Sequence, residues 1–169
     1  MCGRIKLFSV KLQVKKGLMS DVHSPATRSR NMSAIRGKDT KPEMLIRRAL
    51  HARGFRFRLH NRALPGSPDL VLPKHRAAIF VHGCFWHRHD CPMFHWPSSR
   101  EEFWREKLNA NYERDERNIN LLLNAGWRVA VVWECSIRGK HRRDLSAVVD
   151  ALYDWLASDQ HFLTVSGDS

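Results

Sequence analysis

Two segments of the chain carry apolar residues at helical spacing and begin or end with typical helix signals. Thr40 begins the sequence T-K-P-E, which combines an N-cap hydroxyl, an early proline and a glutamate at the capping-box position. We expect a helix from this cap to a stop at Gly54. A second amphipathic helix is predicted near the C-terminus, with its apolar face formed by Leu145, Val148, Val149, Leu152, Trp155 and Leu156.

Between these helices, apolar or alternating runs predict strands. Residues 55–59 alternate strictly between apolar and basic side chains, which indicates a half-buried strand. Residues 69–72 and 77–81 are two apolar runs separated by Pro-Lys-His-Arg, and this arrangement predicts a hairpin. A further buried strand is expected over residues 127–133.

The order of the predicted elements indicates the fold class. Ser99 with Glu102 forms a second capping-box pattern and predicts a long helix that Gly126 ends. The order helix, three strands, helix, strand, helix favours an α/β fold in which helices flank a mixed sheet. We expect one domain over residues 21–157, preceded by a basic N-terminal extension (1–20) and followed by a C-terminal tail (158–169).

Charge is distributed unevenly along the chain and points to a polyanionic partner. The 169 residues include 29 Lys and Arg against 17 Asp and Glu, a net charge of +12. Residues 1–62 hold 16 of the basic residues and only 3 of the acidic ones. A basic face or arm of this kind favours nucleic acid binding, with an anionic membrane surface as the weaker alternative. Because neither a membrane span nor a secretory signal is visible, we expect a soluble, cytoplasmic protein.

Clustered cysteine and histidine residues after the third predicted strand indicate a metal site. Cys84, His89 and Cys91 follow the spacing C-x4-H-x-C, and Cys135 comes at the end of a later strand. Three thiolates and one imidazole are a ligand set that fits tetrahedral zinc with a structural role. His87 is an alternative to His89 as the imidazole ligand. The competing interpretation is a set of buried cysteines without metal beside surface histidines.

Asp69 is a candidate ligand for a hard divalent cation. It stands at the mouth of a strand, directly after the turn sequence P-G-S-P. The predicted hairpin brings His82 beside it, and magnesium held by such a carboxylate can polarise a phosphodiester. His82 and His87 are then candidates for the general base or for phosphate contact. By residue type alone, Asp69 could equally be an aspartate that ends a turn.

At this level of detail the chain resembles a known family. The sequences PATRSRNM, PGSPDLV, FVHGCFWHRHDC, FWREKLNANYERD and GWRVAVVWEC, together with the helix that contains Glu43, are similar to the very short patch repair endonucleases of bacteria. The resemblance covers roughly residues 21–157. It implies a restriction-endonuclease-like fold with a structural zinc. The implied activity is magnesium-dependent nicking beside the thymine of a T:G mismatch left by 5-methylcytosine deamination.

The resemblance also implies roles for individual residues. Asp69 would bind magnesium, the backbone carbonyl of Val81 would supply a second metal contact, and His87 would act as general base. His82 would assist at the scissile phosphate. The implied zinc ligands are Cys84, His89, Cys91 and Cys135. The implied partner is double-stranded DNA with a T:G mismatch, bound by a monomer that works with other mismatch-repair proteins.

Two further active-site candidates carry an ordinary structural explanation as well. Glu43 would tune His87 or the metal-bound water, yet it is equally a capping-box residue. Asp115 lies four residues after Asn111 on one helix face, which is otherwise simply solvated surface. The resemblance places this face near the active site.

Aromatic residues in the same region are candidates for DNA intercalation. Phe85 and Trp86 lie in a polar loop where no hydrophobic period requires them, and Trp104 opens the long helix. The resemblance assigns all three to insertion between base pairs, which costs least at a poorly stacked mismatch. Ordinary core packing is the alternative for these three residues, and it is the expected role of Trp127, Trp133 and Trp155.

The chain departs from the family pattern at three places. Val81 stands where the family often has threonine, and Arg88 and Asp90 interrupt its run of histidines. Residues 1–18 lie outside the resemblance, so they are either a DNA-binding arm or the product of an upstream start codon. Two rival functions remain: a type II restriction endonuclease of the same fold, and a non-catalytic, zinc-stabilised DNA-binding module.

Overall fold

The computed structural model describes Thr27 and residues 37–168, and the fold below concerns residues 37–168. The expected N-terminal extension over residues 1–20 lies outside the described part. The helices are α2 (Lys41–Ala52), α3 (Glu101–Asn124) and α4 (Leu145–Ala157). The strands are β1 (Arg58–Leu59), β2 (Leu70–Leu72), β3 (Ala77–His82), β4 (Arg128–Trp133) and β5 (Phe162–Val165). None of the described helices is both long enough and apolar enough to cross a membrane.

The five strands form one mixed sheet in the order β1-β2-β3-β4-β5. β2 is antiparallel to both β1 and β3, so the predicted hairpin between β2 and β3 is confirmed. β3, β4 and β5 run parallel, and α3 and α4 make the two crossovers that parallel strands require. The α/β class and the mixed sheet are therefore as predicted.

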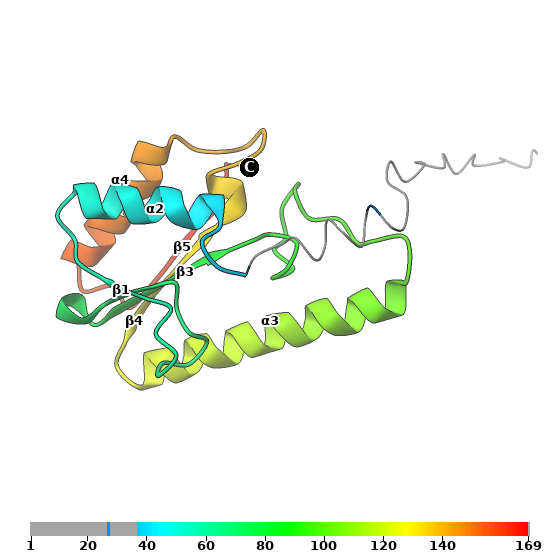
Figure 1. Ribbon diagram of the computed structural model, residues 1–169, viewed down its shortest axis with the longest axis horizontal. Helices are drawn as coiled ribbons and strands as arrows, with labels where there is room; N and C mark the ends of the chain where they lie inside the picture. Colours follow the sequence, from blue (N-terminus) through cyan, green and yellow to red (C-terminus); the bar gives the residue numbers. More distant parts are fainter. Residues whose placement is uncertain (1–26, 28–36, 169) are drawn as a thin grey trace, which may run out of the picture. The chain divides into compact units, whose positions relative to one another are not determined.

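Helices cover both faces of the sheet. α2 and α4 pack together on one face, and the long α3 runs along the other (Figure 1). The alternation along β3 explains this layering, because side chains of successive strand residues point to opposite faces. Ala77 and Ile79 join the core under α2 and α4, whereas Ala78 and Phe80 join the smaller core under α3.

Two segments differ from the sequence-based expectation. Only Arg58 and Leu59 of the alternating run 55–59 pair as a strand, and both are exposed. Phe55 and Phe57 instead pack against the core under α2 and α4. The segment expected as a tail contains β5, which pairs with β4.

The capping-box prediction at Ser99 is also wrong. The N-cap of α3 is Arg100, which has a left-handed backbone (φ 53°) and no side-chain cap. The helix therefore starts one residue later than expected. This shift places Glu102 at the second helical position, where it cannot complete the reciprocal pair.

The capping box of α2 is confirmed, and its removal should destabilise the protein by about 1 kcal/mol. The amide of Glu43 donates to Thr40 Oγ1 at 3.4 Å, and the amide of Thr40 donates to Glu43 Oε2 at 3.3 Å. Thr40→Ala leaves one buried amide without its acceptor, whereas Thr40→Ser keeps the oxygen. Denaturant unfolding of both variants measures the difference. Equal stability of Thr40→Ala and the natural protein would contradict this account.

Candidate active site and metal cluster

The strand register gathers the candidate catalytic residues at one edge of the sheet. In the antiparallel register Leu70, the first residue of β2, pairs with Leu59, the last residue of β1, and with Ile79 in β3. Asp69 directly precedes β2, and His82 ends β3. His60 directly follows β1, and its amide donates to the backbone carbonyl of Asp69 at 3.3 Å. The hairpin thus brings Asp69 and His82 to the same edge, as the sequence predicts.

Asp69 is held by its neighbouring strand and is largely shielded from water. Its Oδ2 accepts a hydrogen bond from the amide of Val81 at 2.8 Å. Burial raises the pKa of the Asp69 carboxyl above its ordinary value, and the Val81 amide acts in the opposite direction. A bound cation would offset the cost of burying this charge, and carboxylates are typical ligands of magnesium.

His87 forms a close pair with Asp115. The Nδ1 atom of His87 lies 2.5 Å from Asp115 Oδ2, in a contact between the loop after β3 and helix α3. A carboxylate accepts the Nδ1 proton, and this leaves Nε2 of a neutral imidazole with a free lone pair. The pair therefore has the geometry of a general base with its orienting group. Both residues were candidates from the sequence, and the structure brings them together.

His82 stacks against His87 and is buried. Their ring centroids are 3.7 Å apart and their planes differ by 3°. Burial lowers the pKa of His82 well below its ordinary value, and the nearby His87 adds to this shift. His82 is therefore a neutral imidazole, which donates a hydrogen bond at one ring nitrogen and accepts one at the other.

These side chains open onto one cleft of about 580 Å³. Asp69, His82, His87 and Asp115 all line it. Its lining also includes three basic side chains, Lys38, Arg62 and Arg114. Basic groups around a site with a carboxylate and imidazoles are suited to an anionic substrate such as a phosphodiester.

Helix α3 holds the loop that carries His87. Asn111 donates its amide to the backbone carbonyl of Trp86 at 3.0 Å, and Arg88 donates to Asn109 Oδ1 at 2.6 Å. The polar run around Asp115 is therefore a docking face for the loop after β3. Its interpretation as simple solvated surface is wrong for these residues.

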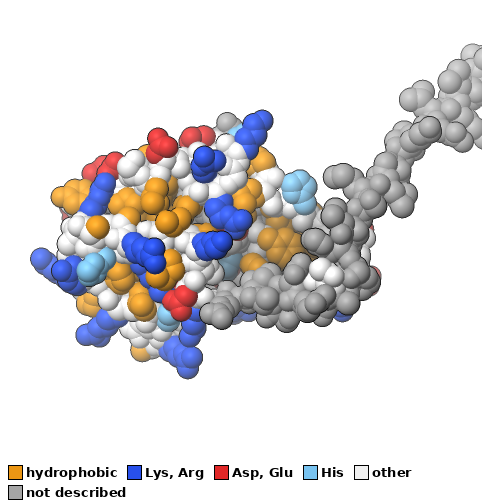
Figure 2. Space-filling view, turned by 45° about the horizontal axis from the view of Figure 1, so that its top comes forward, with side chains coloured by type: hydrophobic (Ala, Val, Ile, Leu, Met, Phe, Trp, Pro, Cys, Tyr) orange, Lys and Arg blue, Asp and Glu red, His pale blue; other side chains and the backbone are white. Residues whose placement is uncertain are grey.

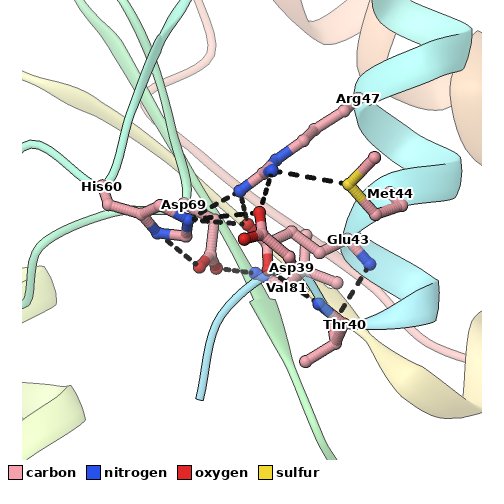
Figure 3. A network of polar contacts seen from close by, with 8 residues as sticks. All are labelled: Asp39, Thr40, Glu43, Met44, Arg47, His60, Asp69 and Val81. Carbon is pink, nitrogen blue, oxygen red and sulfur yellow. Dashed lines mark hydrogen bonds and ion pairs between the residues drawn. The ribbon is translucent and has the colours of Figure 1, made fainter. Parts of the chain in front are cut away.

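Glu43 lies in a polar network that sequence reasoning missed (Figure 3). Its carboxylate is buried and accepts a hydrogen bond from Arg47, one helical turn later. Arg47 also donates to Asp39 Oδ1 at 2.5 Å and contacts His60 Nε2 at 2.7 Å. The contacts recorded for Glu43 within residues 37–168 do not include His87. The sequence contains one signal that could have indicated part of this network, the i,i+4 spacing of Glu43 and Arg47.

Cys84, His89, Cys91 and Cys135 converge as the spacing predicts, with one potential ligand atom from each residue within 4.8 Å of the others. His89 Nδ1 lies 3.6 Å from Cys84 Sγ and 3.5 Å from Cys135 Sγ. The His89 ring also stacks on Trp133 at a centroid distance of 4.0 Å. His89, and not His87, is thus the histidine that the structure places with the cysteines.

The environment of the thiols fits a bound cation. The amide of Cys135 donates to Cys84 Sγ, and the amide of Gly167 donates to Cys135 Sγ, both at 3.3 Å. Burial raises the pKa values of the Cys84 and Cys135 thiols. A metal ion supplies the positive charge that turns such thiols into thiolates. Three sulfurs and one nitrogen are a donor set for zinc.

The three candidate intercalating residues form one aromatic cluster. Phe85 lies 5.2 Å from Trp86 and 5.4 Å from Trp104, measured between ring centroids. All three side chains are half-buried, and Lys107 lies over the Trp86 ring at 5.7 Å. Of the residues expected in the core, Trp155 is buried, whereas Trp127 and Trp133 are only partly buried.

Basic side chains are spread over the described surface. On the face drawn in Figure 2, Lys and Arg side chains alternate with hydrophobic ones, and acidic side chains gather mainly along its upper edge. Such a surface is suited to a phosphate backbone.

Comparison with known proteins identifies the family. A family model described as DNA mismatch endonuclease Vsr matches residues 20–93. The chain is 45% identical over 141 residues to DNA mismatch endonuclease Vsr of Escherichia coli strain K12, a match that covers 83% of this chain and 90% of that protein. It is 49% identical over 119 residues to type II nicking enzyme V.XorIIP of Xanthomonas oryzae, with 70% of this chain and 88% of that protein covered. The resemblance noted in the sequence is thereby confirmed, and the chain belongs to the Vsr family of DNA mismatch endonucleases.

Proposed function

We propose that this protein is a DNA repair endonuclease with a restriction-endonuclease-like fold. It nicks the strand that carries the thymine of a T:G mismatch left by 5-methylcytosine deamination. The observation that carries this proposal is the cleft where Asp69 and the His87–Asp115 pair meet basic side chains. Membership of the Vsr family supports the choice of a mismatch as substrate. The protein acts as a monomer in the bacterial cytoplasm, alongside other mismatch-repair proteins.

Each of these residues of the cleft has a separate role in the proposed reaction. When bound, magnesium supplies positive charge that polarises the phosphodiester and lowers the pKa of a water molecule. Asp69 and the Val81 carbonyl hold the ion. His87 accepts the proton of the attacking water at Nε2, since Asp115 occupies its Nδ1 side. His82, which stacks on His87, contacts the scissile phosphate.

The cluster of three cysteines and His89 binds structural zinc. Its ligands come from the loop after β3 and from Cys135 after β4, so the ion ties the loop that carries His87 to the sheet. A set of four protein ligands leaves no open position for substrate, as in structural zinc sites.

The test uses duplexes labelled separately on each strand, with a T:G mismatch or the matched T:A pair. With magnesium, we expect a single nick in the thymine strand of the mismatched duplex and none without a divalent cation. Cutting of both strands of matched DNA would contradict this proposal and would instead indicate a type II restriction endonuclease. Binding of DNA without any cleavage would contradict it as well and would indicate a non-catalytic DNA-binding module.

The aromatic cluster should determine the preference for mismatched DNA. Its rings can insert at a poorly stacked base step, which costs less than opening a matched one. Trp86→Ala should therefore reduce the ratio of mismatched to matched binding by about 10-fold or more, since stacking on one base contributes about 1–3 kcal/mol. Competition binding with the two duplexes measures this ratio.

Trp127→Phe is the matched control, because Trp127 packs partly buried against the core under α3 and has no recorded ring contact with the aromatic cluster among the described residues. It should leave the ratio unchanged. A Trp86→Ala variant that binds both duplexes more weakly but with the natural ratio would assign Trp86 to loop packing only.

A further inference from the structure

The polar network formed by Asp39, Glu43, Arg47 and His60 has no role in the reaction as described so far (Figure 3). Its two carboxylates and its imidazole lie close enough together to suggest a cation site. Arg47, however, already contacts both carboxylates, so its guanidinium takes the place of an ion. The network therefore needs another explanation.

The position of His60 links this network to Asp69. Its Nε2 faces Arg47 at 2.7 Å, and its Nδ1 faces Asp69 Oδ1 at 3.7 Å. The other carboxylate oxygen, Oδ2, already accepts from the amide of Val81. Among the described residues, His60 is thus the group that faces the other oxygen, Oδ1, of the proposed metal-binding carboxylate.

The contact with Arg47 determines which nitrogen of His60 carries the proton. Nε2 lies 2.7 Å from the Arg47 guanidinium and 3.2 Å from Glu43 Oε1. A guanidinium only donates hydrogen bonds and keeps its proton in proteins, so the nearer group, Arg47, requires a lone pair on Nε2. Nε2 of His60 is therefore the acceptor. In a neutral ring the proton then lies on Nδ1, the atom that faces Asp69.

The network is also built at a conformational cost. Asp39 and His60 both have left-handed backbones, with φ values of 56° and 46°. Residues other than glycine adopt this conformation rarely, and it is concentrated at functional sites. Arg47 is itself buried with its Nε lacking a hydrogen-bond partner among the described residues.

We propose that His60 is a positioning residue for Asp69. Arg47 fixes the proton on Nδ1 of His60, and this N–H orients the Oδ1 atom of Asp69. The carboxylate is then held from both sides, by His60 and by the Val81 amide, with its remaining lone pairs directed at the cation. The Nδ1–Oδ1 separation of 3.7 Å is longer than a hydrogen bond, and we expect it to shorten when the site is loaded, since hydrogen bonds in active sites are often long before substrate is bound. This inference rests on the proposed function, because it requires Asp69 to bind the metal.

The first test reads the His60 tautomer directly and does not depend on activity. In ¹⁵N spectra of histidine rings in the full-length, zinc-loaded protein, we expect Nδ1 of His60 to be protonated and Nε2 to be bare. The signals are assigned by their loss in His60→Asn. The double variant Glu43→Leu/Arg47→Met removes the buried charge pair together, and it should shift the proton toward Nε2. A natural protein with its proton on Nε2 would overturn the proposal.

The second test measures Mn²⁺ binding, with Mn²⁺ as a paramagnetic substitute for Mg²⁺ at oxygen ligands. His60→Leu should weaken Mn²⁺ binding and raise the Mg²⁺ concentration needed for nicking by about 10–100-fold, as is typical when a hydrogen-bond partner of a metal ligand is lost. His60→Asn should restore most of both, since asparagine tolerates the left-handed backbone and offers an N–H near the Nδ1 position. His75→Leu, at another half-buried histidine outside the network, is the control.

The variants distinguish this inference from the proposed function. If Asp69→Asn loses Mn²⁺ binding and nicking while His60→Leu behaves as the natural protein, the function stands and the role of His60 is overturned. If Asp69→Asn keeps both, the metal assignment itself fails, and the inference fails with it. An unchanged affinity for DNA in His60→Leu, with impaired metal binding, supports positioning over a general loss of structure.

Discussion

Replacing Asp69 with asparagine should reduce nicking by about 10³-fold or more, while the protein still binds a mismatched duplex. A metal ion contributes several kcal/mol of charge stabilisation in the transition state, and about 4 kcal/mol corresponds to 10³ in rate. Asparagine keeps the size of the side chain and can still accept the hydrogen bond from the Val81 amide. The change therefore removes the negative charge and little else.

Binding should persist because the groups that attract DNA are separate from this carboxylate. Lys38, Arg62 and Arg114 around the cleft remain, and the removed charge would itself repel a phosphate. Single-turnover nicking and duplex binding, measured on the same preparation, test both statements.

Asp150→Asn is the control for this experiment. Asp150 is an exposed carboxylate on α4 that pairs with Arg53, outside the cleft. It should nick at the natural rate. Natural activity in Asp69→Asn would instead require another carboxylate for the metal, and Asp115 and Glu43 would be the next to replace.

The elements that could be predicted from the sequence are those specified by local pattern. Thr40 and Glu43 sit three residues apart and form the capping box of α2 without help from the rest of the chain. The apolar runs of β2 and β3 are separated by a short turn, so their pairing is also nearly local. The candidate metal ligands in the loop after β3 are recognisable in the sequence because their residue types are rare and closely spaced.

The elements that were missed depend on contacts distant in sequence. β5 is a four-residue strand in which only Val165 is buried, and its pairing with β4 defines it. The run from Phe55 to Leu59 alternates like a strand, but its two phenylalanines are used to fill the core under α2 and α4. The hydrophobic period of a segment indicates which of its side chains are buried, but not which other element of the fold buries them.

The site shows the same division. Asp69, His82 and His87 were predicted because each stands next to an apolar strand or a distinctive motif. His60 and Arg47 have only weak local signals, and they meet only because β1 pairs with β2 while α2 packs above the sheet. The sequence pattern does not reveal that Arg47 is buried between two carboxylates, since Arg47 and Arg48 stand side by side in α2 as two ordinary charged residues.

Removing zinc should unfold the protein. Structural zinc contributes about 10 kcal/mol or more to the folding of small domains, and domains of ordinary size are stable by only about 5–15 kcal/mol. Here the cluster joins the loop after β3 to Cys135 and, through the Gly167 amide, to the chain after β5. We expect one zinc per chain, and we expect a chelator to abolish the cooperative unfolding transition seen by circular dichroism.

Cys135→Ser tests the stabilising role of zinc by removing one of its four proposed ligands. It should yield little soluble, zinc-loaded protein, because two elements lose their common ligand. Cys2→Ser is the matched control, since Cys2 stands apart from the cluster in the sequence and should leave zinc content and stability unchanged. Soluble, folded Cys135→Ser protein with the natural activity and no zinc would show that the cysteines are simply buried.

The two histidines of the loop should respond differently, although only one residue separates them. His89 stacks on Trp133 among the cysteines, whereas His87 contacts Asp115 in the cleft. His89→Ala should therefore lose zinc and stability together. His87→Ala should keep its zinc and its fold but lose about 10²–10⁴-fold in the rate of nicking, the usual contribution of a general base. Metal analysis and single-turnover kinetics on both variants measure this, and zinc loss in His87→Ala with zinc retained in His89→Ala would reverse the two assignments.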